Sequence, residues 1–156
     1  MKRLEMSRST WSSLLSMLRT QSDGVREAGA FLLGTQTRNA LRIKDWVAYH
    51  VLSDQVGQAD YITLESDAFV RLWQICRERD LRAVADVHTH PCGAHQSVTD
   101  RAYPMIATPG HVALIVPDYA QGDIDVTDIS INIYKGSHQW ASYTGTANRQ
   151  WMHVTS

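Results

Sequence analysis

Apolar residues recur at helical spacing in two segments of the chain. The first segment follows Ser9 and Thr10 and ends at Asp23-Gly24, and the second starts at Thr63 after a polar loop at 53–60. Side chains three or four positions apart lie on one face of a helix, so each segment is expected to pack one face against a core. The apolar positions are Trp11, Leu14, Leu15 and Leu18 in the first segment and Leu64, Ala68, Leu72, Ile75 and Cys76 in the second.

Strand patterns dominate the rest of the chain. Continuous apolar runs indicate strands buried on both faces, and the alternation of apolar and polar residues at 129–134 indicates a strand with one wet face. The order of predicted elements, α-β-β-α-β-α-β-β-β, is that of an α/β protein. Strands are predicted at 28–34, 41–51, 82–88, 111–116, 129–134 and 140–143, and a helix interrupted at Pro104 is predicted at 97–107.

Composition describes an ordinary globular protein. The 156 residues predict a single domain over 1–156, with a polar tail at about 145–156 that is expected to be mobile from Gln150 to Ser156. A net charge of −1 gives no electrostatic reason to expect nucleic acid or an anionic membrane as a partner. Two cysteines do not make a disulfide framework, and no apolar run reaches the roughly eighteen residues of a membrane span. A cytoplasmic protein is expected.

The segment at 88–100 carries the clearest candidate chemistry: His-Thr-His-Pro-Cys-Gly-Ala-His-Gln-Ser-Val-Thr-Asp. Residues two apart in a strand point to the same side, so His88 and His90 can converge on one point. Two imidazoles and the carboxylate of Asp100 form a ligand set that suits Zn2+ and leaves a fourth position open for water. An open position is typical of a catalytic zinc site, so the pattern favours a hydrolase.

Each part of this segment also has a purely structural interpretation. Either histidine can be a satisfied core residue or a surface residue, and a His-x-His pair alone is a weak signal. Ser97 and Asp100 have the spacing of a capping box at the start of a helix. The two interpretations are compatible, because a capped helix start is a rigid place to mount a ligand and a hydroxyl. Asp86 shares a face with His88 but lies further from the loop, so it is the weaker candidate ligand.

The segment resembles the JAMM motif of the JAB/MPN metalloprotease family, which reads His-x-His-Pro, a short loop and Ser-x-x-Asp. That family pairs the motif with an upstream glutamate, and this chain offers Glu27-Ala-Gly-Ala-Phe-Leu-Leu-Gly34 in the right order. The resemblance extends over most of the chain, from about residue 8 to about residue 143. One departure is the loop length: nine residues separate His90 from Asp100, where the family more usually has ten. Another is Cys92, to which no role is assigned.

The resemblance implies a role for each matched residue. His88, His90 and Asp100 would bind Zn2+, Glu27 would be the general base, and Ser97 would donate a hydrogen bond to the oxyanion. It also implies a mixed, curved β-sheet flanked by helices, layered as in cytidine deaminases. His95 lies in the same loop, and it is expected to be an exposed residue.

The resemblance further implies a zinc-dependent isopeptidase or peptidase that cuts after the C-terminal glycine tail of ubiquitin or a ubiquitin-like protein. Compact prokaryotic members accompany E1- and E2-like enzymes of the same operon, some in antiviral defence. Two alternatives remain open: a catalytically inactive MPN-type scaffold, and a zinc amidohydrolase acting on a small or sulfur-carrier substrate. The complete set of motif residues argues against the scaffold, because such scaffolds usually lose ligands.

Overall fold

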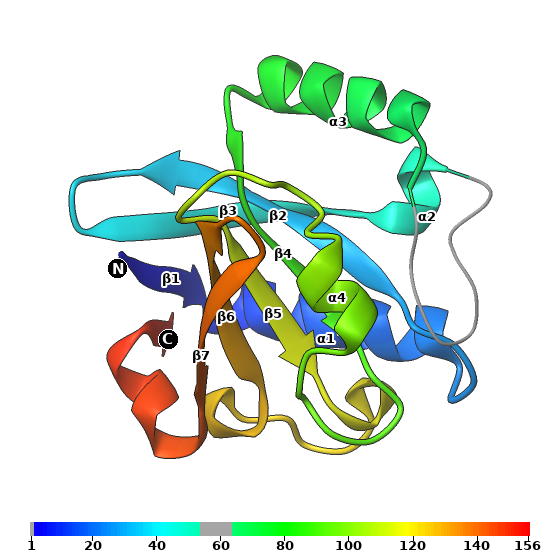
Figure 1. Cartoon of the computed structure of the whole chain (residues 1–156), viewed down its shortest axis with the longest axis vertical. Coiled ribbons are helices and arrows are strands. Elements are labelled where there is room, and N and C mark those ends of the chain that lie inside the picture. The colour runs from blue at the N-terminus through cyan, green and yellow to red at the C-terminus, as the bar shows by residue number, and fades with distance from the viewer. Residues whose placement is uncertain (1, 54–63) are drawn as a thin grey trace.

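The computed structural model describes residues 2–53 and 64–156 (Figure 1). Most of the predicted loop at 53–60, and the predicted helix start at Thr63, lie outside these residues. Leu64, also predicted to be helical, is described and precedes the helix, which begins at Ser66. No helix in the described ranges is both long and apolar enough to cross a membrane. The elements are β1 (Arg3–Ser7), α1 (Arg8–Ser22), β2 (Gly29–Gln36), β3 (Ala40–Ala48), α2 (Tyr49–Leu52), α3 (Ser66–Arg79), β4 (Arg82–Thr89), α4 (Val98–Ala102), β5 (Val112–Val116), β6 (Ser130–Gly136), β7 (Gln139–Thr144) and β8 (Met152–Thr155), with short helical turns η1 (Asp118–Ala120), η2 (Val126–Asp128) and η3 (Gly145–Gln150).

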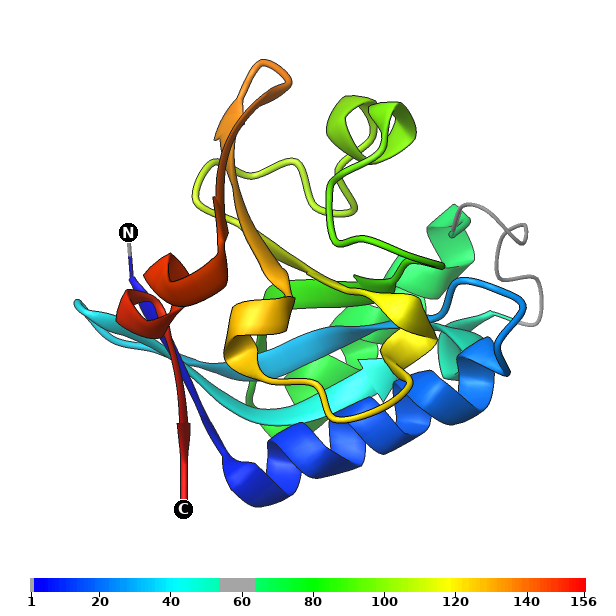
Figure 2. The same ribbon diagram turned by 90° about the horizontal axis from the view of Figure 1, so that it is seen from below.

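Eight strands form one mixed sheet in the order β7-β6-β5-β4-β2-β3-β1-β8. Strand β4 lies near the middle, antiparallel to β2 and parallel to β5. The sheet curls strongly along its length, so that β6 and β7 rise away from β2 and β3 (Figure 2). The predicted mixed, curved sheet with flanking helices is confirmed.

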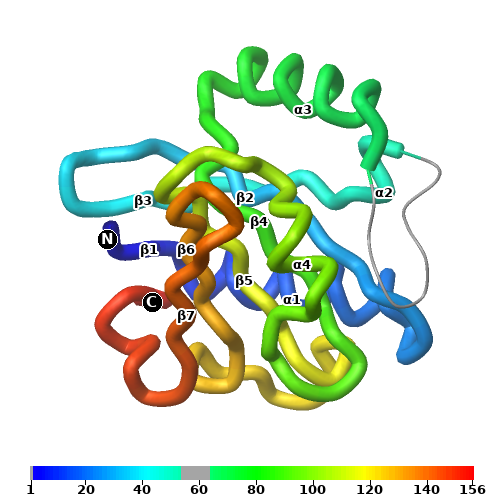
Figure 3. The backbone as a smooth tube through the Cα atoms, viewed as in Figure 1, coloured from blue at the N-terminus to red at the C-terminus, as the bar shows by residue number. Residues whose placement is uncertain are grey.

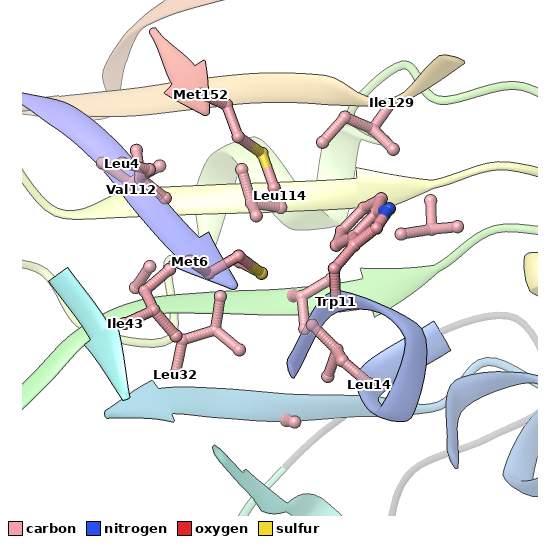
Figure 4. Packing of buried hydrophobic residues seen from close by; sticks show 14 of the residues in the cluster. Leu4, Met6, Trp11, Leu14, Leu32, Ile43, Val112, Leu114, Ile129 and Met152 are labelled. Atoms are coloured by element: carbon pink, nitrogen blue, oxygen red, sulfur yellow. The ribbon is translucent and has the colours of Figure 1, made fainter. Parts of the chain in front are cut away.

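Helix α1 covers one face of the sheet and supplies the larger core. Its buried residues include Trp11 and Leu14, the apolar positions that the sequence predicted. They pack with Leu32 of β2 and Leu114 of β5 (Figure 4). Ser7 caps the helix, because its Oγ accepts a hydrogen bond from the backbone N–H of Thr10 at 3.0 Å.

Helix α3 covers the opposite face, where a second core forms. The strand β2 serves both cores, because successive side chains of a strand point to opposite faces. Leu32 packs on the α1 side, whereas Phe31 and Leu33 pack on the α3 side. The buried residues of α3 are Ala68, Leu72 and Cys76, as the predicted apolar stripe requires.

Both chain ends differ from the sequence-based expectation. Strand β1 at the N-terminal end pairs in parallel with β8, so Met152–Thr155 of the tail predicted as mobile belong to the sheet. The two chain ends lie near each other in Figure 3. Leu4 and Met152 anchor this pair, since both are buried in the first core. Two internal elements are also shorter than predicted: β3 ends at Ala48, and α4 ends before Pro104, which cannot continue a helix.

Gly34 allows β2 and β3 to approach closely at an irregularity in their pairing. A Cβ atom at this position would overlap the backbone carbonyl group of Arg42, which cannot turn away as a flexible side chain can. We expect Gly34→Ala to lower the free energy of unfolding by about 1–3 kcal/mol. In thermal unfolding this corresponds to a fall in Tm of about 2–12 °C.

Gly93→Ala is the matched control, because the nearest atom to its added Cβ is a side-chain carbon of His95 at 3.9 Å. Its Tm is expected to stay unchanged or to rise by up to about 4 °C, the equivalent of about 1 kcal/mol. Equal Tm values for the two variants would contradict the close approach at Gly34.

Candidate metal centre

Strand β4 delivers the two histidines to one point. His88 is the penultimate residue of the strand and His90 follows its end. Their Nε2 atoms lie 3.1 Å apart, which confirms the convergence predicted from the spacing. The backbone of His90 is fixed on both sides: its N–H donates to the carbonyl of Val116 at 2.9 Å, and its carbonyl accepts from the N–H of Tyr119 at 2.9 Å.

Thr89, between the two histidines, points to the α1 side of the sheet and ties three elements together. Its Oγ1 lies 2.8 Å from Oγ of Ser22 at the end of α1 and accepts a hydrogen bond from the backbone N–H of Ala28 at 3.0 Å. The N–H of Thr89 in turn donates to the carbonyl of Ala28 at 2.9 Å. This buried network fixes the backbone next to Glu27, and the sequence analysis missed it.

Glu27 reaches the histidines because β2 runs antiparallel to β4. The first residue of β2, Gly29, pairs with His88, so Glu27, two residues before the strand, lies near the end of β4. The Oε1 atom of Glu27 is 3.3 Å from Nε2 of His90 and 3.9 Å from Nε2 of His88. Its side chain is only 3% exposed. Glu27, His88 and His90 form a buried group that can hold a metal ion.

Asp100 brings a second carboxylate to the same two imidazoles. Its Oδ1 lies 3.4 Å from Nε2 of His88, and its Oδ2 lies 3.0 Å from Nε2 of His90. The capping box that the sequence suggested is present: Oγ of Ser97 accepts from the N–H of Asp100 at 3.0 Å, and Oδ2 of Asp100 accepts from the N–H of Ser97 at 2.9 Å. The cap therefore orients the carboxylate toward the histidines.

The separations between these donor atoms fit Zn2+. Ligand atoms about 2.0–2.2 Å from a tetrahedral zinc ion lie about 3.3 Å from one another. The His88–His90, His90–Glu27 and both Asp100 separations, from 3.0 to 3.4 Å, are close to that value, whereas the His88–Glu27 separation of 3.9 Å is longer. Imidazole nitrogen and carboxylate oxygen are both ordinary zinc ligands. Two three-residue sets are geometrically possible, since either carboxylate can complete the histidine pair.

Negative charge dominates the electrostatics of the centre. Burial by itself would lower the pKa of His88, but the hydrogen bond and charge of Asp100, together with the charges of Asp86 and Glu27, raise it above the usual value. Burial would raise the pKa of Asp100, yet hydrogen bonds from His88 and His90 and from the backbone of Ser97 hold it well below its usual range. Asp100 is therefore ionised at neutral pH, as a metal ligand must be.

A buried acid–histidine pair next to the centre was not predicted. Nε2 of His111 lies 2.7 Å from Oδ2 of Asp86, and both side chains are almost fully buried. Asp86 points to the same face of β4 as His88. Its carboxylate is paired with His111, which lies outside the metal centre. The only signal in the sequence was an acid inside an apolar strand. His95 and Cys92 are exposed, as expected for the loop that carries them.

The structure thus brings Glu27, His88, His90, Ser97 and Asp100 to one place. No protein-family model matches the chain. The chain is 23% identical over 145 residues to a Sinorhizobium fredii protein named probable metalloprotease y4jG, a match that covers 93% of this chain and 90% of that protein. Nearly the whole chain is therefore similar to a protein named as a metalloprotease, and its buried Glu-His-His group can hold a metal ion.

Solved structures share the fold. A solution structure of a protein from Desulfitobacterium hafniense matches with a TM-score of 0.74 at 13% identity, over 98% of this chain and 93% of that one. A solution structure from Salinibacter ruber matches with a TM-score of 0.55 at 19% identity, over 92% of this chain and 88% of that one. At these identities the likeness concerns the arrangement of strands and helices.

Proposed function

We propose that this protein is a zinc-dependent peptidase of the JAMM type. The observation that carries the proposal is the grouping of His88 and His90 with two carboxylates. Glu27 and Asp100 each have a carboxylate oxygen within 3.9 Å of the Nε2 atom of each histidine. Similarity to a protein named as a metalloprotease supports the reaction class. His88, His90 and Asp100 would hold the ion. A bound Zn2+ would supply a Lewis acid and lower the pKa of a coordinated water to about 7.

Glu27 is assigned the proton transfers. Its Oε1 lies beside both imidazoles, and its side chain is buried, so it can accept the proton of the attacking water and pass it to the departing amine. Asp100 is assigned the ligand role because each of its oxygens faces one imidazole and its own backbone cap holds it there. In this assignment Asp100 is the carboxylate held in a fixed position as a ligand, and Glu27 is the carboxylate that exchanges a proton.

Ser97 is assigned the stabilisation of the oxyanion that forms on the substrate carbonyl. Its Oγ already accepts a hydrogen bond from the N–H of Asp100, and an oxygen that accepts at a lone pair still has its own proton to donate. The hydroxyl is thus oriented by the helix cap and able to donate to the oxygen on which charge develops. The capping and catalytic interpretations of Ser97 do not compete.

For the substrate we propose a ubiquitin-like protein with a C-terminal glycine tail, cut immediately after its terminal glycine. This part rests on the JAMM resemblance of the motif residues. The resemblance also suggests E1- and E2-like enzymes of the same operon as partners, in antiviral defence. A tail poor in side chains can enter a narrow centre in an extended conformation, in which main-chain hydrogen bonds supply affinity.

The simplest test uses a ubiquitin-like protein that carries a few extra residues after its terminal glycine. Zinc-loaded protein is expected to release those residues, and a zinc chelator should stop the reaction. A serine-acylating inhibitor should have no effect, because Ser97 stabilises charge and does not attack the substrate. Intact fusion together with hydrolysis of a small amide would replace this proposal with the amidohydrolase alternative, and the absence of any hydrolysis by zinc-loaded protein would favour the scaffold.

A further inference from the structure

A cavity of about 280 Å3 opens directly beside the metal centre. His88 and Asp100 line it together with apolar and aromatic residues, among them Met105, Ala113 and Trp140. Its volume is near the lower end of the range for small-molecule sites, about 300 Å3. The cavity is therefore large enough for a side chain of a bound substrate.

The apolar wall is held in place by contacts outside the cavity. The indole Nε1 of Trp140, on β7, donates to the backbone carbonyl of Arg101 in α4 at 3.0 Å. The ring of Trp140 also lies against that of Tyr134, with centroids 5.0 Å apart. Met105 packs against the second core, which α3 covers. Because these contacts order the wall in advance, a ligand would not have to pay the entropic cost of ordering it.

The polar groups of the cavity are suited to a peptide. The Oε1 atom of Gln96 is buried and has no hydrogen-bond partner within residues 2–53 and 64–156. Gln96 also lines the cavity, so its amide can bond the main chain of a substrate. The carboxylate of Asp86 lines the cavity as well, but it is already paired with His111 at 2.7 Å. The cavity thus favours an apolar side chain attached to a polar main chain.

The position of Glu27 sets the direction of the substrate. Glu27 does not line this cavity; it lines a separate one together with Arg26, Tyr49 and His50. The departing amine must lie on the side of the group that protonates it. The acyl part of the substrate then extends away from Glu27, toward Trp140.

We infer that the cavity lined by Met105 and Trp140 is a specificity pocket for an apolar side chain in the acyl part of the substrate, at the residue preceding the terminal glycine. This inference rests on the proposed function. It names the substrate class more narrowly: a tail ending in an apolar residue followed by glycine, whereas a tail with two final glycines would leave the pocket without a side chain. Gln96 positions the main chain of that tail.

The first test compares peptide substrates whose acyl part ends in Leu-Gly, Gly-Gly or Asp-Gly. We expect kcat/KM to be at least about tenfold higher for Leu-Gly than for the other two. Trp140→Ala and Thr99→Phe should each reduce that ratio toward one, the former by removing the wall and the latter by filling the cavity from the exposed position 99. Trp73→Ala, on α3 and half exposed, is the matched control and should leave the ratio unchanged.

The second test measures binding without hydrolysis. The purified protein is titrated with N-acetyl-leucylglycinamide or N-acetyl-glycylglycinamide, and the indole N–H signal of Trp140 is followed by NMR, with Trp140→Phe identifying the signal. Saturable movement with the leucyl compound alone supports the pocket, even if no peptide is cut and the peptidase proposal fails. Cleavage without preference, together with an unmoved Trp140 signal, would overturn the pocket and leave the peptidase standing.

Discussion

Replacing both His88 and His90 by alanine is expected to abolish zinc binding and, with it, all hydrolysis. Wild-type protein should bind about one zinc ion per chain, because Nε2 of His88, Nε2 of His90 and the carboxylate of Asp100 lie within 3.4 Å of one another. The double variant should remain folded, since neither histidine belongs to the two apolar cores. Elemental analysis measures the metal, and circular dichroism measures the fold.

Thermal unfolding gives an independent measure of the same site. Zinc at about one hundred times its Kd stabilises a folded protein by about 2.7 kcal/mol. For a domain of this size that is a rise in Tm of about 5–11 °C, expected for wild type and absent from the double variant. His50→Ala combined with His153→Ala is the matched control, because both histidines are exposed. Full zinc occupancy in the His88/His90 variant would overturn the ligand assignment.

Glu27→Gln is expected to retain zinc and to lose about 10²–10⁴ in kcat. The amide keeps the size of the side chain but cannot accept a proton at neutral pH. Asp100→Asn is the informative counterpart, because the two carboxylates approach the same imidazoles from different elements. It should lose zinc affinity, since an ionised ligand is replaced by a neutral one.

The pair of variants decides between the two ligand sets that the geometry allows. Zinc lost from Glu27→Gln and retained by Asp100→Asn would exchange the roles of the two carboxylates. Near wild-type turnover in Glu27→Gln would show that another group carries the proton. Gln21→Glu or Gln21→Ala at the neighbouring cavity offers a control outside the donor set, and zinc content should not change in either.

The sequence alone was sufficient for the features that depend on local periodicity. The apolar stripes of α1 and α3 identified the residues that each helix buries, because helix geometry fixes which side chains share a face. The spacing of His88 and His90 similarly fixed their convergence, because alternate residues of a strand share a side. The Ser97–Asp100 cap is also local, and it formed as the spacing indicated.

Tertiary structure decided what depends on residues far apart in the chain. The pairing of β1 with β8 joins the two ends of the chain. Neither short segment carries a sequence pattern that identifies the other as its partner. The Thr89–Ser22 bond and the Asp86–His111 pair are likewise long-range, and each residue alone looks like an ordinary polar side chain. Only the packing of β7 and α4 places Trp140 beside the metal centre. His88, His90 and Asp100 can be recognised from their local spacing. The approach of Glu27 to them and the shape of the pocket arise from contacts between elements that no local pattern encodes.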